Sequence, residues 1–175
     1  MAGHNKWKQI KEKKGATDAK RSKLFTKYAK LIRVEARLAK GDINSPMLRA
    51  AIENAKAAYM PKENIERAVA SAMGAQADEK VLYEAYGPGG CALIITGLTD
   101  NNNRTVQEIK HLLSEHNTSL GTQGSVMWAF TKNAEGGYTP NNTVTLSEDD
   151  EEKLGALMED LHDHDDIQDI YTNAA

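Results

Sequence analysis

Basic side chains recur at helical spacing between residues 20 and 40, a pattern that is typical of a polyanion-binding surface. Lysine or arginine returns at steps of three or four, so these side chains share one face of a helix. A row of such cations neutralises phosphates and releases their counterions. We therefore expect a solvated basic ridge that binds nucleic acid. On this face we expect phosphate contacts from Lys20, Lys23, Lys27, Lys30 and Arg33, and Arg21, which lies nearer the apolar side, is a further candidate.

The segment before this helix carries more lysines around a tryptophan. An indole flanked by ammonium groups suits base stacking beside phosphate contacts. The alternative for Trp7 is that it holds the segment against the helices together with Ile10, and the two roles are compatible. The expected contacts here are Lys6, Trp7, Lys8, Lys11 and Lys13.

The formal net charge of −3 conceals a strong separation of charge along the chain. Residues 1–40 hold 13 basic and 3 acidic residues, residues 41–80 hold 5 and 6, and residues 81–175 hold 4 and 16. A basic module therefore precedes an acidic one. We expect the acidic part to repel nucleic acid and to contact a protein partner. The alternative is a solvated lysine-rich helix that binds nothing.

The patterns of common catalytic and metal sites are missing or weak. The sequence lacks a Gly-x-x-x-x-Gly-Lys-[Ser/Thr] phosphate loop, and no nucleophile elbow surrounds Ser125. Residues 162–166 read His-Asp-His-Asp-Asp, which suits a metal, but the end of a polar helix explains them better. Cys91, the one cysteine, heads an apolar run and is expected in the core. We predict a protein without catalytic centre, metal or cofactor.

Periodicity divides the chain into two modules. Apolar positions predict a helix over 18–40, a second that starts at Ser45 and Pro46, and a third that follows Pro61 and ends at Gly74. These three helices form the predicted module 1–78, which ends in a short polar linker. The first module should therefore be a compact helical unit.

The second module, residues 79–175, alternates strands and helices. Strands are predicted at 81–86, 91–98, 125–130, 143–146 and 167–171. One helix is predicted to follow a cap among residues 100–103 or at Thr105, and another follows Ser147. Thr105 and Glu108 are spaced for a capping box at the first of these helices. After an extra N-terminal hairpin strand, the order is βαββαβ, which is the ferredoxin-like pattern. The predicted class is α+β.

Several strings, in order along nearly the whole chain, resemble the signatures of the YebC family. They are MAGHNKW at 1–7, YEAYGPGG at 83–90, TDNNNRT at 99–105, GTQGSVMW at 121–128 and DDIQDIYTN at 165–173. The resemblance implies a non-enzymatic protein with a helical module and ferredoxin-like α/β modules. Family members are described as DNA-binding transcriptional regulators, and others, including mitochondrial translational activators, as acting on ribosomes stalled at proline-rich sequences.

We favour an RNA- or ribosome-associated translation factor that relieves stalling. Nothing in the sequence resembles a helix-turn-helix base reader, so recognition by shape and charge fits better. A DNA-binding transcriptional regulator is the alternative, and a protein-interaction scaffold is the second. Arg104, at the start of a helix, is a weaker candidate contact. With one cysteine and neither a membrane span nor a signal sequence, the chain is expected in the cytoplasm.

The chain departs from the family at one place. YebC proteins usually carry a third module between the strand that ends near Phe130 and the strand near Val144. Here the loop 131–142 bridges that gap, with Gly136, Gly137 and Pro140 in it. The βαββαβ pattern is complete without the insert, so we expect the remaining domain to fold.

Overall fold

The computed structural model describes residues 18–74 and 77–175, which form two compact units. The helical unit consists of residues up to Lys80 together with residues 98–101, and the sheet unit consists of residues 81–97 and 102–175. The class is α+β, as predicted: three helices precede a domain built on antiparallel sheets. The predicted contacts Lys6, Trp7, Lys8, Lys11 and Lys13 lie outside the described residues.

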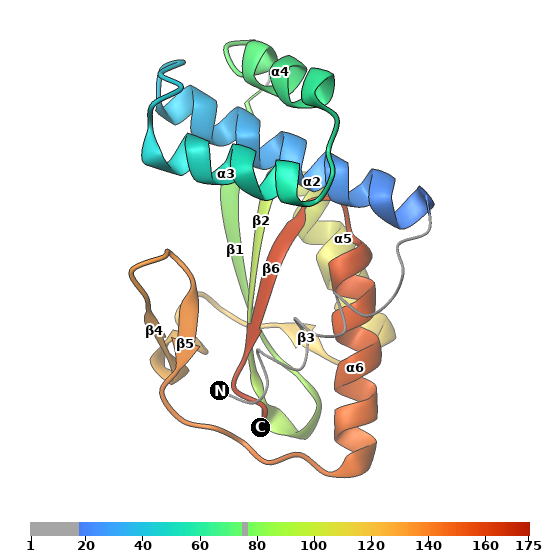
Figure 1. Ribbon diagram of the computed structural model, residues 1–175. Coiled ribbons are helices and arrows are strands. Elements are labelled where there is room, and N and C mark those ends of the chain that lie inside the picture. The colour runs from blue at the N-terminus through green and yellow to red at the C-terminus, as the bar shows by residue number, and fades with distance from the viewer. Residues whose placement is uncertain (1–17, 75–76) are drawn as a thin grey trace. The chain divides into compact units, whose positions relative to one another are not determined.

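The helical unit consists of α2 (Asp18–Leu38), α3 (Pro46–Ala57) and α4 (Lys62–Ser71) (Figure 1). The predicted helix breaks are confirmed, because α2 ends before Gly41, whose φ of 83° suits glycine, and α3 begins at Pro46. Alanine provides five of the nine residues in the buried cluster, so the helices pack closely. The cluster is Ile32, Ala36, Leu48, Ala51, Ala55, Met60, Ile65, Ala68 and Ala72.

The sheet unit is built on a four-stranded sheet in the order β3-β1-β2-β6. Its strands are β1 (Glu79–Tyr86), β2 (Ala92–Thr99), β3 (Ser119–Leu120) and β6 (Ile167–Thr172). The short turn Pro88–Gly90 connects the two central strands, and its Gly89 adopts a φ of 66°. β6 pairs antiparallel with β2, and β3 pairs antiparallel with β1. The strands predicted at 81–86, 91–98 and 167–171 are therefore confirmed.

Helices α5 (Asn102–Glu115) and α6 (Glu148–Asp163) cover one face of this sheet (Figure 1). Their apolar sides bury a cluster of leucine and isoleucine with the strands, and Leu93, Ile95, Ile109, Leu157 and Leu161 are fully buried in it. Ser147 caps α6 as predicted, since its Oγ accepts a hydrogen bond from the backbone N–H of Asp150. The acidic first turn of α6 also suits the positive end of its dipole.

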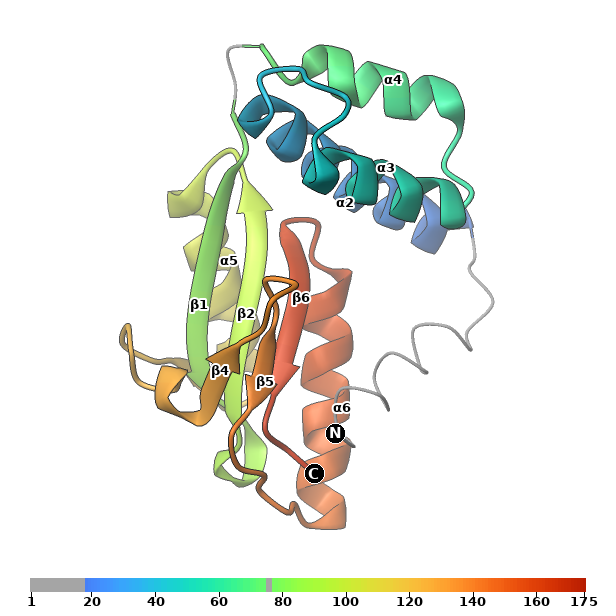
Figure 2. The same ribbon diagram turned by 60° about the vertical axis from the view of Figure 1, so that its left-hand side comes forward.

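A small hairpin lies over the opposite face of the sheet (Figure 2). It pairs β4 (Phe130–Lys132) with β5 (Tyr138–Pro140), and it follows a 3-10 turn at Met127–Ala129. Phe130 and Tyr138 are buried there with Ile94 of the central strand. The segment 131–142, predicted as a loop, therefore contains nearly all of a paired hairpin, with Phe130 alone outside it.

The strand predicted at 125–130 is wrong except for its last residue. The cause is Glu84, a buried carboxylate on β1. It accepts hydrogen bonds from the backbone N–H groups of Gly124 (2.6 Å), Val126 (2.8 Å) and Met127 (3.1 Å). Because these donors are satisfied by a side chain, they do not join a strand ladder.

Two further local predictions are wrong. The strand predicted at 143–146 is reduced to one bridge between Val144 and Ala174. The capping box fails because α5 already begins at Asn102, which places Thr105 inside the helix, where its hydroxyl donates to Asp166 (2.7 Å). Among the described residues, no helix is long and apolar enough to cross a membrane.

Candidate nucleic-acid interface

The predicted basic ridge on α2 divides into an exposed part and a part that is used within the helical unit. Lys20, Arg21 and Lys23 are all exposed in the first two turns of the helix. Asp18 is the acidic residue of that first turn. This end of α2 therefore presents cations to solvent at a spacing that suits successive phosphates.

Further along α2 the ridge is less exposed than the sequence predicts. Lys27 is buried, with 6% of its surface exposed, so the expectation that it lies in solvent is wrong. Lys30 is half-buried. The spacing of three or four residues places these lysines on one face, but it does not reveal what packs against that face.

The last two basic residues of α2, Arg33 and Arg37, are held by contacts inside the helical unit. The Arg33 guanidinium pairs with the Asp78 carboxylate at 2.7 Å, and 5% of that carboxylate's side chain is exposed. Arg37 donates to the carbonyl of Gly74 (3.2 Å) near the end of α4. Because Arg33 is ion-paired, it is a weaker candidate for phosphate contact than the sequence predicts.

A second ion pair runs beside the first. Glu35 of α2 is buried, and its carboxylate lies 3.0 Å from the Lys80 ammonium. Residues 78–80, the end of the segment predicted as a linker between the modules, are therefore held to α2 through Asp78 and Lys80. Buried carboxylates of this kind are stable only with such partners.

A groove of about 540 Å³ separates α3 from α4, and its charges are mixed. Ile52, Ile65 and Val69 give it an apolar lining. Arg49 and Lys56 lie beside Glu53 and Glu66 along its walls, so the groove is a poor phosphate channel. The complete lining is Ile43, Arg49, Ile52, Glu53, Lys56, Ile65, Glu66, Val69 and Ala70.

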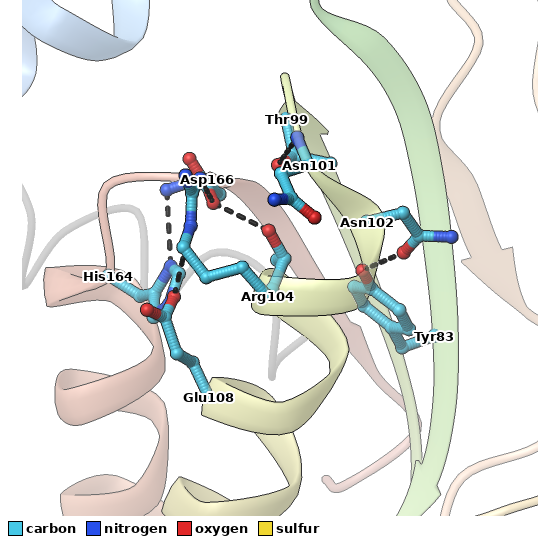
Figure 3. Close-up of polar contacts among 9 residues, drawn as sticks. Tyr83, Thr99, Asn101, Asn102, Arg104, Glu108, His164 and Asp166 are labelled. Carbon is cyan, nitrogen blue, oxygen red and sulfur yellow. Dashed lines mark hydrogen bonds and ion pairs between the residues drawn. The ribbon is translucent and has the colours of Figure 1, made fainter.

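Arg104, the weaker candidate, belongs to a polar network at the start of α5 (Figure 3). Its guanidinium lies 2.9 Å from the buried carboxylate of Asp166 and 3.8 Å from Glu108. His164 completes the network, with its Nε2 3.0 Å from Glu108 and its Nδ1 accepting the backbone N–H of Asp166. This network joins α5 to the turn before β6, and that structural role explains Arg104.

The same network brings three possible metal ligands within 4.8 Å, namely Glu108, His164 and Asp166. Since Nδ1 of His164 accepts a hydrogen bond, its proton is on Nε2, which donates to Glu108. Neither imidazole nitrogen then offers a lone pair to a cation, and Arg104 supplies positive charge to both acids. The donor set therefore fits a metal poorly.

Two exposed aromatic residues of the sheet unit were not predicted as site residues. Tyr86 is 41% exposed and Trp128 is 61% exposed. Their side chains meet at one point, because both donate to the carbonyl oxygen of Ser125, at 2.7 and 2.9 Å. The strand predicted at 125–130 gave no reason to pair these two residues. The exposed position of Trp128 depends on the 3-10 turn that stands in place of that strand.

Two domain models of one protein family together match nearly the whole chain. The TACO1/YebC protein N-terminal domain matches residues 5–75, and the TACO1/YebC second and third domain matches residues 78–135 and 131–174. The second match is interrupted where the sequence indicates that a module is absent. Together the matched residues include both units.

Similar proteins carry regulatory names. The chain is 39% identical to a probable transcriptional regulatory protein of Kosmotoga olearia, over 99% of this chain and 94% of that one. That alignment has 236 positions, more than the 175 residues here, so part of the relative has no counterpart. A probable transcriptional regulatory protein of Desulfosudis oleivorans is 46% identical over 98% of this chain and 71% of its own length.

A solved structure shares the fold. It is the crystal structure of a conserved hypothetical protein from Aquifex aeolicus, which matches with a TM-score of 0.82. The two sequences are 29% identical, and the match covers 90% of this chain and 91% of the other.

Proposed function

The chain belongs to the TACO1/YebC family, and we propose that it is a non-enzymatic regulator that binds structured RNA on the translating ribosome. It contacts phosphates through the start of α2 and relieves stalled translation. The relatives' names support a regulatory role at the coarser level. The ribosome as target is the finer part of the proposal.

One observation carries the binding surface. Lys20, Arg21 and Lys23 are exposed together at the start of a helix, within a sequence whose first 40 residues hold 13 basic and 3 acidic residues. Three cations within four residues match the close spacing of phosphates along a nucleic-acid strand. Arg33 and Arg37 are less available than these exposed residues, because they are bound to Asp78 and to the Gly74 carbonyl in the helical unit.

RNA fits the rest of the helical unit better than a base sequence in duplex DNA. A recognition helix in the major groove presents polar side chains to base edges and tolerates few acids near phosphates. Helix α3 carries the acidic Glu53 beside its basic residues, and α4 carries the acidic Glu63 and Glu66 beside its own. With these helices near charge balance, α2 supplies the positive surface, and binding relies on shape and charge.

DNA remains the second candidate because the relatives are named probable transcriptional regulatory proteins. The same cations on α2 serve either nucleic acid, since phosphate contacts carry no sequence information. The two candidates differ in whether duplex DNA displaces the protein from the ribosome.

Co-sedimentation of the full chain with ribosomes across a salt series tests the proposal, with duplex DNA as competitor. Replacing Lys20, Arg21 and Lys23 together by Ala should weaken binding by about tenfold or more and reduce the salt slope of log affinity by about 2 to 3. Weak displacement by duplex DNA supports the ribosome, whereas full displacement favours the DNA candidate.

The matched control removes the same charge elsewhere. Lys56, Lys62 and Lys110 are exposed, and replacing all three by Ala changes the net charge equally. This variant should bind almost as the parent does. Equal loss in both triple variants would show that net charge rather than this surface drives binding. Binding to neither ribosomes nor DNA would favour a protein-interaction scaffold.

A further inference from the structure

The geometry points to a stacking site on the sheet unit, where Trp128 and Tyr86 hold an unpaired nucleobase of single-stranded RNA. This inference rests on the proposed function and adds a second contact, separate from the phosphates at α2. The site lies in the sheet unit, and neither of its rings is among the basic residues from which the sequence predicts nucleic-acid binding.

The two rings are exposed although the other described aromatic residues of the sheet unit are mostly buried. Trp128 is 61% exposed and Tyr86 is 41% exposed, whereas Tyr83, Phe130 and Tyr138 are each at most 9% exposed. Two exposed rings that bond to one carbonyl oxygen form an exposed aromatic patch, and such a patch indicates an interaction site where a single exposed ring such as Tyr59 does not.

The pair is fixed before any ligand arrives. The Tyr86 hydroxyl and the Trp128 indole N–H both donate to the Ser125 carbonyl. The backbone on either side of Ser125 donates to the buried Glu84 carboxylate, and the Trp128 carbonyl accepts from the Asn141 amide (3.1 Å). Binding here therefore costs little side-chain entropy.

These bonds also decide what the rings offer. Each ring uses its only polar hydrogen on the protein backbone, so a ligand meets the π-faces and, on Tyr86, the acceptor lone pairs of the hydroxyl oxygen. A flat aromatic partner gains most from such a face, and a nucleobase stacks on indole or phenol irrespective of its sequence. Thr122 and Gln123 lie exposed in the same loop and provide hydrogen-bonding groups for a base edge.

The charge of this region suits an RNA strand better than the rest of the sheet unit does. Residues 81–175 contain 16 acidic residues, but between residues 117 and 147 the charged residues are Lys132 and Glu135 alone. The acidic side chains concentrate on α6, whose first turn has four. A phosphate backbone is repelled less at the loop of Trp128 than along that helix.

The test compares two probes of equal charge, a short oligoadenylate and the same oligomer without bases. The full chain should prefer oligoadenylate, and Trp128→Leu should reduce that preference by about tenfold, the worth of one stacked base. Trp128→Phe keeps a ring and should retain most of the preference. In a Trp7→Phe background, oligoadenylate should also quench the fluorescence of Trp128.

Two control variants separate this site from the phosphate contacts. Tyr59→Leu removes an aromatic side chain that is 87% exposed on the helical unit, and it should leave the preference unchanged. Replacing Lys20, Arg21 and Lys23 by Ala should weaken both probes alike. If the parent binds both probes equally and the triple variant weakens both, the proposed function stands and the stacking site is overturned.

The remaining outcomes also decide. If the parent binds neither probe, the stacking site is overturned, and co-sedimentation with ribosomes decides the proposed function separately. An unchanged preference in Trp128→Leu overturns the site even if the protein binds RNA. Quenching of Trp128 by a proline-rich peptide but not by oligoadenylate overturns it in favour of a peptide ligand.

Discussion

The two units of the chain hold together by different means. Five alanines contribute to the nine-residue cluster of the helical unit, whereas leucine and isoleucine dominate the cluster under α5 and α6 in the sheet unit. Small side chains let helices approach closely but remove little apolar surface from water. The helical unit adds polar ties, in which Arg33 pairs with Asp78 and Lys80 with Glu35. Since the sheet unit also has an ion pair, Arg104 with Asp166, the difference lies mainly in packing: the helical unit depends on close fit and the sheet unit on burial.

The largest effect is expected from a cavity in the sheet unit. Leu157 of α6 is fully buried, so Leu157→Ala should lower the free energy of unfolding by about 3 kcal/mol. This loss of unfolding free energy is measured by urea unfolding, with thiol labelling of Cys91 as the probe. Cys91 is buried in the same cluster, and burial raises the pKa of its thiol, so it reacts only after this unit opens.

The control for that cavity removes the same atoms from a surface position. Leu82 on β1 is 39% exposed, and Leu82→Ala should cost about 1 kcal/mol or less. A loss of equal size in the two variants would contradict the claim that burial dominates this unit.

An enlarged alanine tests the close fit of the helical unit. Ala55 of α3 is fully buried, and Ala55→Leu should destabilise this unit by about 2 kcal/mol because the helices must separate. Helical circular dichroism during urea unfolding measures the change. Ala50→Leu places the same side chain at an exposed position of the same helix and should have an effect of at most about 0.5 kcal/mol. A helical unit that accepts leucine at both positions is not closely packed.

The smallest effect is expected from the ion pair. Asp78→Asn should lower the free energy of unfolding of the helical unit by about 1 kcal/mol, discounted because the Arg33 side chain is 30% exposed and solvent screens it. Glu79→Gln makes the same change of charge at the next, exposed residue. The two variants should differ in their chemical unfolding at low salt and converge at high salt. No difference at low salt would remove the ion pair from the comparison.

The elements with strong periodicity were predictable from the sequence, and those defined by a distant side chain were not. The C-terminal end of α2 and the start of α3 followed from Gly41 and Pro46, whose backbone preferences are local. The segment at 125–130 looks like a strand because it is apolar, yet the Glu84 carboxylate captures its N–H groups from about forty residues away. Composition does not show such a partner.

The same reason limits prediction of the site. Helical spacing correctly placed Lys20 and Lys23 on the surface of α2. It gave no sign that Lys27 is buried, or that the carboxylate of Asp78 meets Arg33 from 45 residues away. The Arg104 contact to Asp166 likewise joins residues 62 apart. Residue type predicts what a side chain is able to bind, but the tertiary fold decides what it meets.

The β4–β5 hairpin bears on how this family gains and loses parts. The Asn133 N–H donates to the Gly137 carbonyl (2.9 Å), so the backbone that leaves β4 returns beside its starting point. The interruption of the family match lies at this same hairpin. A folded insert with adjacent ends enters such a point at the cost of closing a short loop, and it leaves the register of the main sheet unchanged. We therefore expect the hairpin tip to accept an inserted domain, such as a grafted reporter, without loss of the fold of the sheet unit.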